Sequence, residues 1–93
     1  MEAEITAAIR TLIDQLGRLG AQFGASEYSG QSFGDFYVDC RLGQKSFRLI
    51  RHRGQYMVDG DTRELKRLGL FRVYDSKDEF EAAILNYARM SDR

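Results

Sequence analysis

The residues that most readily suggest catalysis are the one cysteine of the chain, Cys40, and its one histidine, His52. A thiol beside an imidazole can act as an activated nucleophile. Both residues lie in segments where apolar and polar side chains alternate, which predicts β-strands, and the alternation places them on opposite faces of the sheet. We therefore expect Cys40 to be a buried core thiol and His52 to be a half-exposed strand residue near Asp35.

The acidic residues do not form a catalytic or metal-binding pattern. Asp35 and Asp39 lie on one predicted strand with basic residues expected opposite, which favours the ionised form of both carboxyls. Asp59 and Asp61 flank a predicted turn, but the further ligands of a calcium loop are missing. The glycine patterns of dinucleotide and P-loop sites are also missing, and one cysteine cannot form a multi-cysteine metal site or an intramolecular disulfide. The sequence thus predicts no enzyme, no catalytic residue, no metal site and no cofactor.

The elements that carry these residues centre on residues 34–59, GDFYVDCRLGQKSFRLIRHRGQYMVD. The alternation there predicts three antiparallel strands in a meander with two tight turns. A turn at residues 43–44 pairs Asp39 with Arg48 and Tyr37 with Ile50. A second turn at residues 53–54 places Met57 opposite Ile50, whereas a turn at residues 54–55 places it opposite His52. The face expected to be buried consists of Phe36, Val38, Cys40, Phe47, Leu49, Tyr56 and Val58.

Helices are predicted on both sides of this meander. From residue 3 onward, apolar residues at spacings of three and four form a helical stripe, and glycines at 17 and 20 weaken the helix after Leu16. The stripe consists of Ile5, Ile9, Leu12, Leu16, Leu19 and Phe23, with Ala8 and Ile13 beside it. Asp61 with Glu64, and Ser76 with Glu79, are capping-box patterns that predict a short helix and a closing helix. The closing helix extends to about residue 90, and residues 91–93 are expected to fray.

Two segments are left open by the sequence. Residues 24–34, GASEYSGQSFG, are rich in glycine and serine and favour either a loop or one short irregular strand around Tyr28. Residues 70–74, LFRVY, favour either a short strand or an extended connector. The expected fold is therefore α+β: an N-terminal helix, a three- to four-stranded antiparallel meander, a short helix and a C-terminal helix, with the helices packed on one sheet face.

Length and composition limit the functional classes. The 93 residues predict a single domain, residues 1–93, and no apolar run is long enough to cross a membrane. The N-terminus has acidic residues where a secretory signal has basic ones, so we expect a cytoplasmic protein. The formal net charge is zero, yet residues 41–72 hold nine basic and three acidic side chains. This basic middle could bind nucleic acid or a protein partner.

The order of elements also resembles that of the double-stranded RNA-binding domain, which runs helix, three strands, helix. That family has a lysine-rich tract at the start of its last helix, where it contacts phosphates. The corresponding residues 76–81 read SKDEFE, whose three acids would repel a nucleic-acid backbone. A small nucleic-acid-binding domain is therefore a disfavoured alternative.

The chain resembles the small cytoplasmic immunity proteins encoded beside bacterial polymorphic toxins of the contact-dependent, Rhs or type VI kind. The resemblance lies in RLIRHRGQY at residues 48–56 and in LKRLGLFRVYDSKDEFEAAILNYA at residues 65–88. It implies a protein that binds one cognate toxin protein tightly and blocks its activity. A secretion chaperone or adaptor, which is usually a dimer, is the other alternative; the sequence leaves the oligomeric state and the identity of the toxin open.

The expected partner-binding residues lie on the outer face of the sheet, opposite the face that the helices cover. Tyr37, Ile50 and Met57 are expected to form an apolar row across three strands. Charged residues on a rim around an apolar centre are typical of protein interfaces. The rim is expected to consist of Asp35, Asp39, Arg48 and His52. The competing interpretation is that the loop around Tyr28 or the short helix from Thr62 folds over the row.

Overall fold

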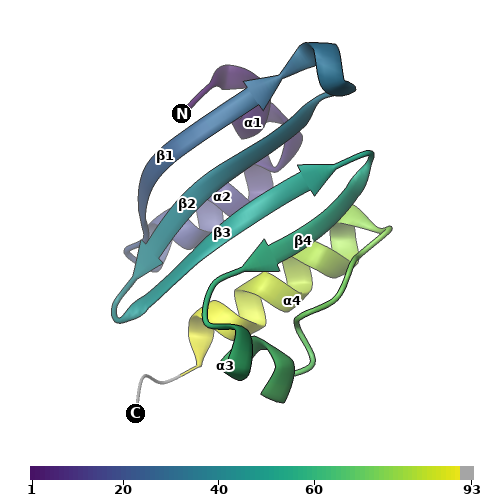
Figure 1. The fold of residues 1–93 in the computed structure, drawn as a ribbon. Coiled ribbons are helices and arrows are strands. Elements are labelled where there is room, and N and C mark those ends of the chain that lie inside the picture. The colour runs from purple at the N-terminus through teal and green to yellow at the C-terminus, as the bar shows by residue number, and fades with distance from the viewer. Residues whose placement is uncertain (91–93) are drawn as a thin grey trace.

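A computed structural model describes residues 1–90 and confirms the expected α+β fold (Figure 1). The expected fraying of residues 91–93 lies outside the described part of the chain. Every helix within residues 1–90 is too short or too polar to span a bilayer. In chain order the elements are α1 (Ala3–Ala8), α2 (Arg10–Arg18), β1 (Gln22–Ser29), the 3₁₀ turn η1 (Gly30–Ser32), β2 (Asp35–Leu42), β3 (Lys45–His52), β4 (Gln55–Asp59), α3 (Thr62–Arg67) and α4 (Lys77–Arg89).

The sheet is an antiparallel meander in the order β1-β2-β3-β4, and its central register is the predicted one. Asp39 pairs with Arg48, and Tyr37 pairs with Ile50. The second turn is at residues 53–54, because Met57 pairs with Ile50. Arg53 and Gly54 both have positive φ, +53° and +79°, as a two-residue type I′ hairpin requires.

The segment that the sequence left open forms the edge strand β1 and the short turn η1. β1 pairs with β2, but two residues between Phe23 and Ser26 face one residue of β2, so the strand contains a β-bulge. A bulge breaks the alternation of apolar and polar residues. For this reason the pattern at residues 24–34 did not indicate a strand of eight residues.

The N-terminal helix differs from the predicted continuous stripe in two ways. At Ile9 the backbone departs from helical geometry, with φ −129° and ψ 42°, and divides α1 from α2. The helix then ends at Arg18, because Gly20 adopts a φ of +98° and the Ala21 N–H donates to the Leu16 carbonyl. The expectation that Leu19 and Phe23 continue the stripe is therefore wrong: Leu19 is exposed, and Phe23 packs against the core from β1.

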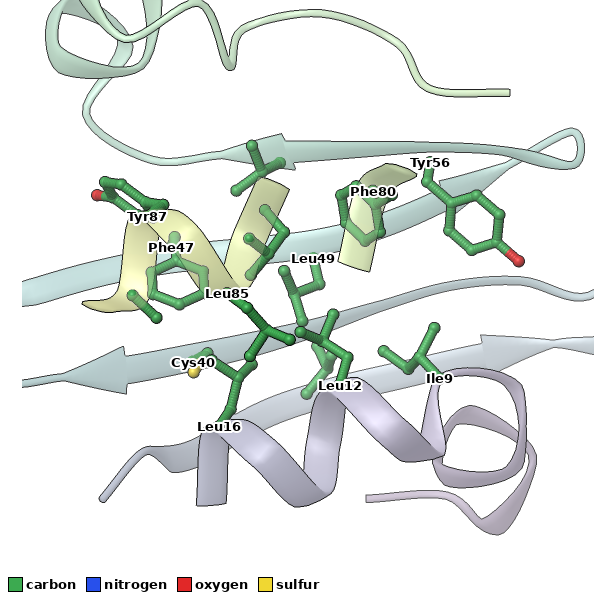
Figure 2. Close-up of a cluster of buried hydrophobic side chains, with 14 of the residues drawn as sticks. Ile9, Leu12, Leu16, Cys40, Phe47, Leu49, Tyr56, Phe80, Leu85 and Tyr87 are labelled. Atoms are coloured by element: carbon green, nitrogen blue, oxygen red, sulfur yellow. The ribbon is translucent and has the colours of Figure 1, made fainter. Parts of the chain in front are cut away.

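The core lies between one sheet face and the helices α1, α2 and α4, which all lie behind the sheet in Figure 1. The predicted inner residues of β2, β3 and β4 are all buried. Figure 2 shows Leu12 and Leu16 projecting from α2 toward the sheet, while α4 supplies Phe80, Leu85 and Tyr87. The Tyr87 ring meets the Phe47 ring edge-on, with centroids 5.5 Å apart. Burial of these side chains is the main stabilising term of the fold.

Both predicted helix N-caps are formed by side-chain hydrogen bonds. The Asp61 side chain accepts from the Glu64 N–H, and the Ser76 hydroxyl accepts from the Glu79 N–H, each at 3.2 Å. Between α3 and α4 the chain is an irregular connector with bends at residues 71, 72 and 75 and a single bridge, in which Tyr56 and Tyr74 exchange two backbone hydrogen bonds of 2.8 Å. This bridge ties the connector to the edge of β4.

Candidate protein-binding face

The outer face of the sheet carries the predicted apolar row. Tyr37, Ile50 and Met57 lie side by side on β2, β3 and β4, and each is half-buried. Neither expected cover lies over them. Tyr28 pairs with Phe36 and so belongs to the inner face, and α3 lies clear of the strands in Figure 1, which looks onto the outer face. The row is thus open to a partner.

One side of the row is bordered by an ion pair that also contacts the row. Arg48 donates two hydrogen bonds to the Asp39 carboxylate, at 2.6 and 3.2 Å. These bonds hold the pKa of Asp39 below its usual value and raise the pKa of Arg48. The same guanidinium lies 4.0 Å from the centre of the Tyr37 ring, a cation–π contact. Arg48 therefore contacts both the Asp39 carboxylate and the Tyr37 ring and holds the two side chains in position.

The other side of the row is bordered by Asp35 and His52. Their side chains approach to 3.0 Å between Oδ2 and Nδ1, and the His52 side chain is more than half exposed. The second oxygen of Asp35 accepts a hydrogen bond from the Arg53 N–H at 2.9 Å. Asp35 therefore links the start of β2 to the turn between β3 and β4.

In the structure, Phe71 and Val73 extend the apolar surface of the row. The sequence did not predict this extension. These connector residues are 47% and 45% exposed. Together with Ile50 and Met57 they line an open hollow of about 360 Å³ at the edge of β4. Leu70 and Tyr74 are buried while the apolar residues between them are not, and no sequence pattern indicated this difference. The hollow extends the row beyond the sheet.

The residues that suggested nucleophilic chemistry lie apart. Cys40 is buried on the inner face, and burial raises the pKa of its thiol to about 11. His52 is on the outer face beside Asp35. Within residues 1–90 no group of three or more His, Cys, Asp and Glu side chains is placed to hold a metal ion.

The basic side chains of residues 41–72 do not share one surface. Arg48 is on the outer face, whereas Arg51 pairs with Phe36 and Tyr56 and therefore belongs to the inner side of the sheet. Arg72 lies 4.3 Å from the Tyr74 ring centre. Tracking of phosphates requires basic groups along one surface, so this arrangement does not favour a nucleic-acid site.

Comparison of the chain with models of protein families, with curated proteins and with solved structures finds no match. The outer face, with its open apolar row and its ordered charged border, is the feature of residues 1–90 that best fits a binding site.

Proposed function

We propose that this protein is a cytoplasmic immunity protein that neutralises a cognate bacterial toxin domain by binding it with the outer face of its sheet. The observation that carries the proposal is the uncovered row of Tyr37, Ile50 and Met57 within a border of charged side chains. Apolar centres with a polar rim are the usual composition of stable protein interfaces.

The energetics of this face suit tight binding. Apolar area that the partner removes from water contributes roughly 25 cal/mol per Å². The Tyr37 ring and the Arg48 guanidinium are already held against each other and by Asp39, so little side-chain entropy remains to be lost on association. The hollow beside Phe71 and Val73 can receive an apolar side chain of the partner.

The resemblance to immunity proteins supports a toxin as the partner. Its first segment, residues 48–56, forms most of the β3–β4 hairpin, and its second, residues 65–88, forms the end of α3, the connector and nearly all of α4. These segments contribute Arg48, Ile50 and His52, and also Phe71 and Val73 of the hollow. The residues that carry the resemblance therefore overlap the face that we propose as the interface.

Co-expression tests the proposal. The proposal predicts a large secreted protein with a C-terminal toxin domain encoded immediately upstream of this gene, and expression of that domain alone should stop the growth of a bacterial host. Co-expression of this protein should restore growth, and the two purified proteins should elute together in gel filtration. Absence of both protection and a complex would overturn the proposal; a stable dimer that does not protect would instead favour a secretion chaperone.

A further inference from the structure

Phe33 is an exposed aromatic residue in an unfavourable backbone conformation. Its side chain is 86% exposed, whereas the other exposed large apolar residues among residues 1–90 lie between 40% and 47%. Its φ is +59°, in the left-handed region that bulky side chains rarely adopt. Neither burial nor backbone preference thus stabilises a phenylalanine at this position.

The surrounding turn holds Phe33 in this conformation. The Gly34 N–H donates to the Ser29 carbonyl at 3.1 Å and closes the turn between β1 and β2. The Phe33 carbonyl accepts a hydrogen bond of 2.8 Å from Nη1 of Arg51 on β3. Strained residues persist where their surroundings determine them, and they occur preferentially at functional sites. The turn therefore presents the ring from a fixed backbone.

Phe33 is close in the chain to the first outer-face residue of β2. Two residues later in the chain, Asp35 begins β2 and binds both His52 and the Arg53 N–H. The Phe33 carbonyl is also bonded to Arg51, the neighbour of His52 on β3, so Phe33 lies at the same end of the sheet as the Asp35–His52 pair. We propose that Phe33 is an anchor residue that inserts into an apolar pocket of the partner protein when the outer face docks. The identity of that partner rests on the proposed function.

A protein pocket fits Phe33 better than a lipid surface does. Membrane binding by exposed apolar residues needs an extended apolar helix face or a strong basic patch. Near Phe33, Arg51 donates a hydrogen bond to the Phe33 carbonyl. Asp35 accepts a hydrogen bond from the Arg53 N–H and lies beside His52, so an acidic group is placed among the basic ones. A single aromatic ring on a fixed turn is instead typical of interface anchors, which fill a pocket at low entropic cost.

The test uses Phe33→Gly and Phe33→Ala, with Gln31→Ala in the same turn as control. Because glycine removes both the exposed ring and the backbone penalty, the melting temperature of Phe33→Gly should equal or exceed that of wild type. Both Phe33 variants should bind the purified toxin domain at least about tenfold more weakly, measured by calorimetry, while Gln31→Ala binds as wild type does.

Four results would overturn this assignment. Wild-type affinity in both folded Phe33 variants would remove Phe33 from the interface and leave the proposed function standing. A large fall in the melting temperature of Phe33→Gly would show a structural role. Sedimentation of the wild type, but not of Phe33→Ala, with phosphatidylserine–phosphatidylcholine vesicles would assign Phe33 to lipid. A wild-type protein that does not bind the toxin domain would overturn the proposed function and this assignment together.

Discussion

The guanidinium of Arg48 lies 4.0 Å from the centre of the Tyr37 ring, although the two residues are on different strands and are not paired in the register. Arg48 reaches the ring diagonally while it remains bonded to Asp39, its partner across the strands. Asp39 and Tyr37 are two residues apart on β2 and therefore share the outer face. The three side chains form one ordered unit where the apolar row of the proposed interface meets its charged border.

The Arg48–Asp39 pair predicts a pH dependence of stability. Because Arg48 lowers the folded-state pKa of Asp39, the pair stabilises the fold above the unfolded pKa of about 3.9, and this contribution is lost as the pH falls through the folded value. Both side chains are about two-fifths exposed, so water screens the pair and its expected contribution to stability is small.

Urea unfolding of wild type and Asp39→Asn measures this contribution. The wild type should be the more stable protein near neutral pH, and the difference should shrink as the pH falls below the unfolded pKa of the carboxyl. Asp14→Asn, on an exposed part of α2, serves as control and should show no such change. A difference between wild type and Asp39→Asn that is the same near neutral pH and at acidic pH would contradict the assigned role of the pair.

Phe47→Ala tests the packing of the inner face. Phe47 is buried against Tyr87, and loss of a core aromatic ring costs about 3–5 kcal/mol of unfolding free energy. The neighbouring Ser46 is exposed, so Ser46→Ala should change the unfolding free energy by less than about 0.5 kcal/mol. An unchanged melting temperature for Phe47→Ala would show that the face assignment is wrong.

Cys40 should be inert in the folded protein. Since burial raises its pKa to about 11, little thiolate exists at neutral pH, and reagents cannot reach the sulfur without unfolding. Labelling by a disulfide reagent near pH 8 should therefore follow the unfolding rate and become fast only in denaturant. Rapid stoichiometric labelling under native conditions would place Cys40 at the surface.

The basic middle of the chain should bind nucleic acid only weakly and without specificity. Any affinity for duplex RNA or DNA should fall steeply with salt, because neutralised phosphates release counterions. Fluorescence anisotropy at low and at physiological salt measures this. Submicromolar binding at physiological salt that is lost in Arg48→Ala and Arg51→Ala would favour a nucleic-acid-binding protein over a toxin inhibitor.

Much of the fold could be predicted because local signals agreed with one another. The first turn and the period of two set the register of β2 and β3 and the faces of β4, while the sequence left the second turn at either residues 53–54 or residues 54–55. The capping patterns at Asp61 and Ser76 marked two helix starts. Strand β1 could be predicted only as an alternative to a loop, because its bulge removes the alternation. The division of the first helix at Ile9 could not be predicted, since the apolar spacing continues through it.

The candidate face could be predicted only in part, for a related reason. Register alone brings Tyr37, Ile50 and Met57 together. The sequence predicted the pairing of Tyr37 with Ile50 but left Met57 opposite either Ile50 or His52. The position of Phe71 depends on how the connector returns along β4 through the Tyr56–Tyr74 bridge, which is a tertiary contact. The exposure of Phe33 likewise depends on the conformation of a turn rather than on a sequence period.

The double variant Tyr37→Ala with Arg48→Glu tests the central claim most directly. The measurement is the dissociation constant for the cognate toxin domain, determined by calorimetry on protein whose circular dichroism and melting transition show a folded state. Removal of the Tyr37 ring together with reversal of the charge at position 48 should weaken binding at least about a hundredfold. Asp14→Arg, on the exposed side of α2, should bind as the wild type does. A folded double variant with wild-type affinity would contradict the account and move the interface to the helices, where Glu4 of α1 and Asp78 and Glu79 of α4 provide acidic surface.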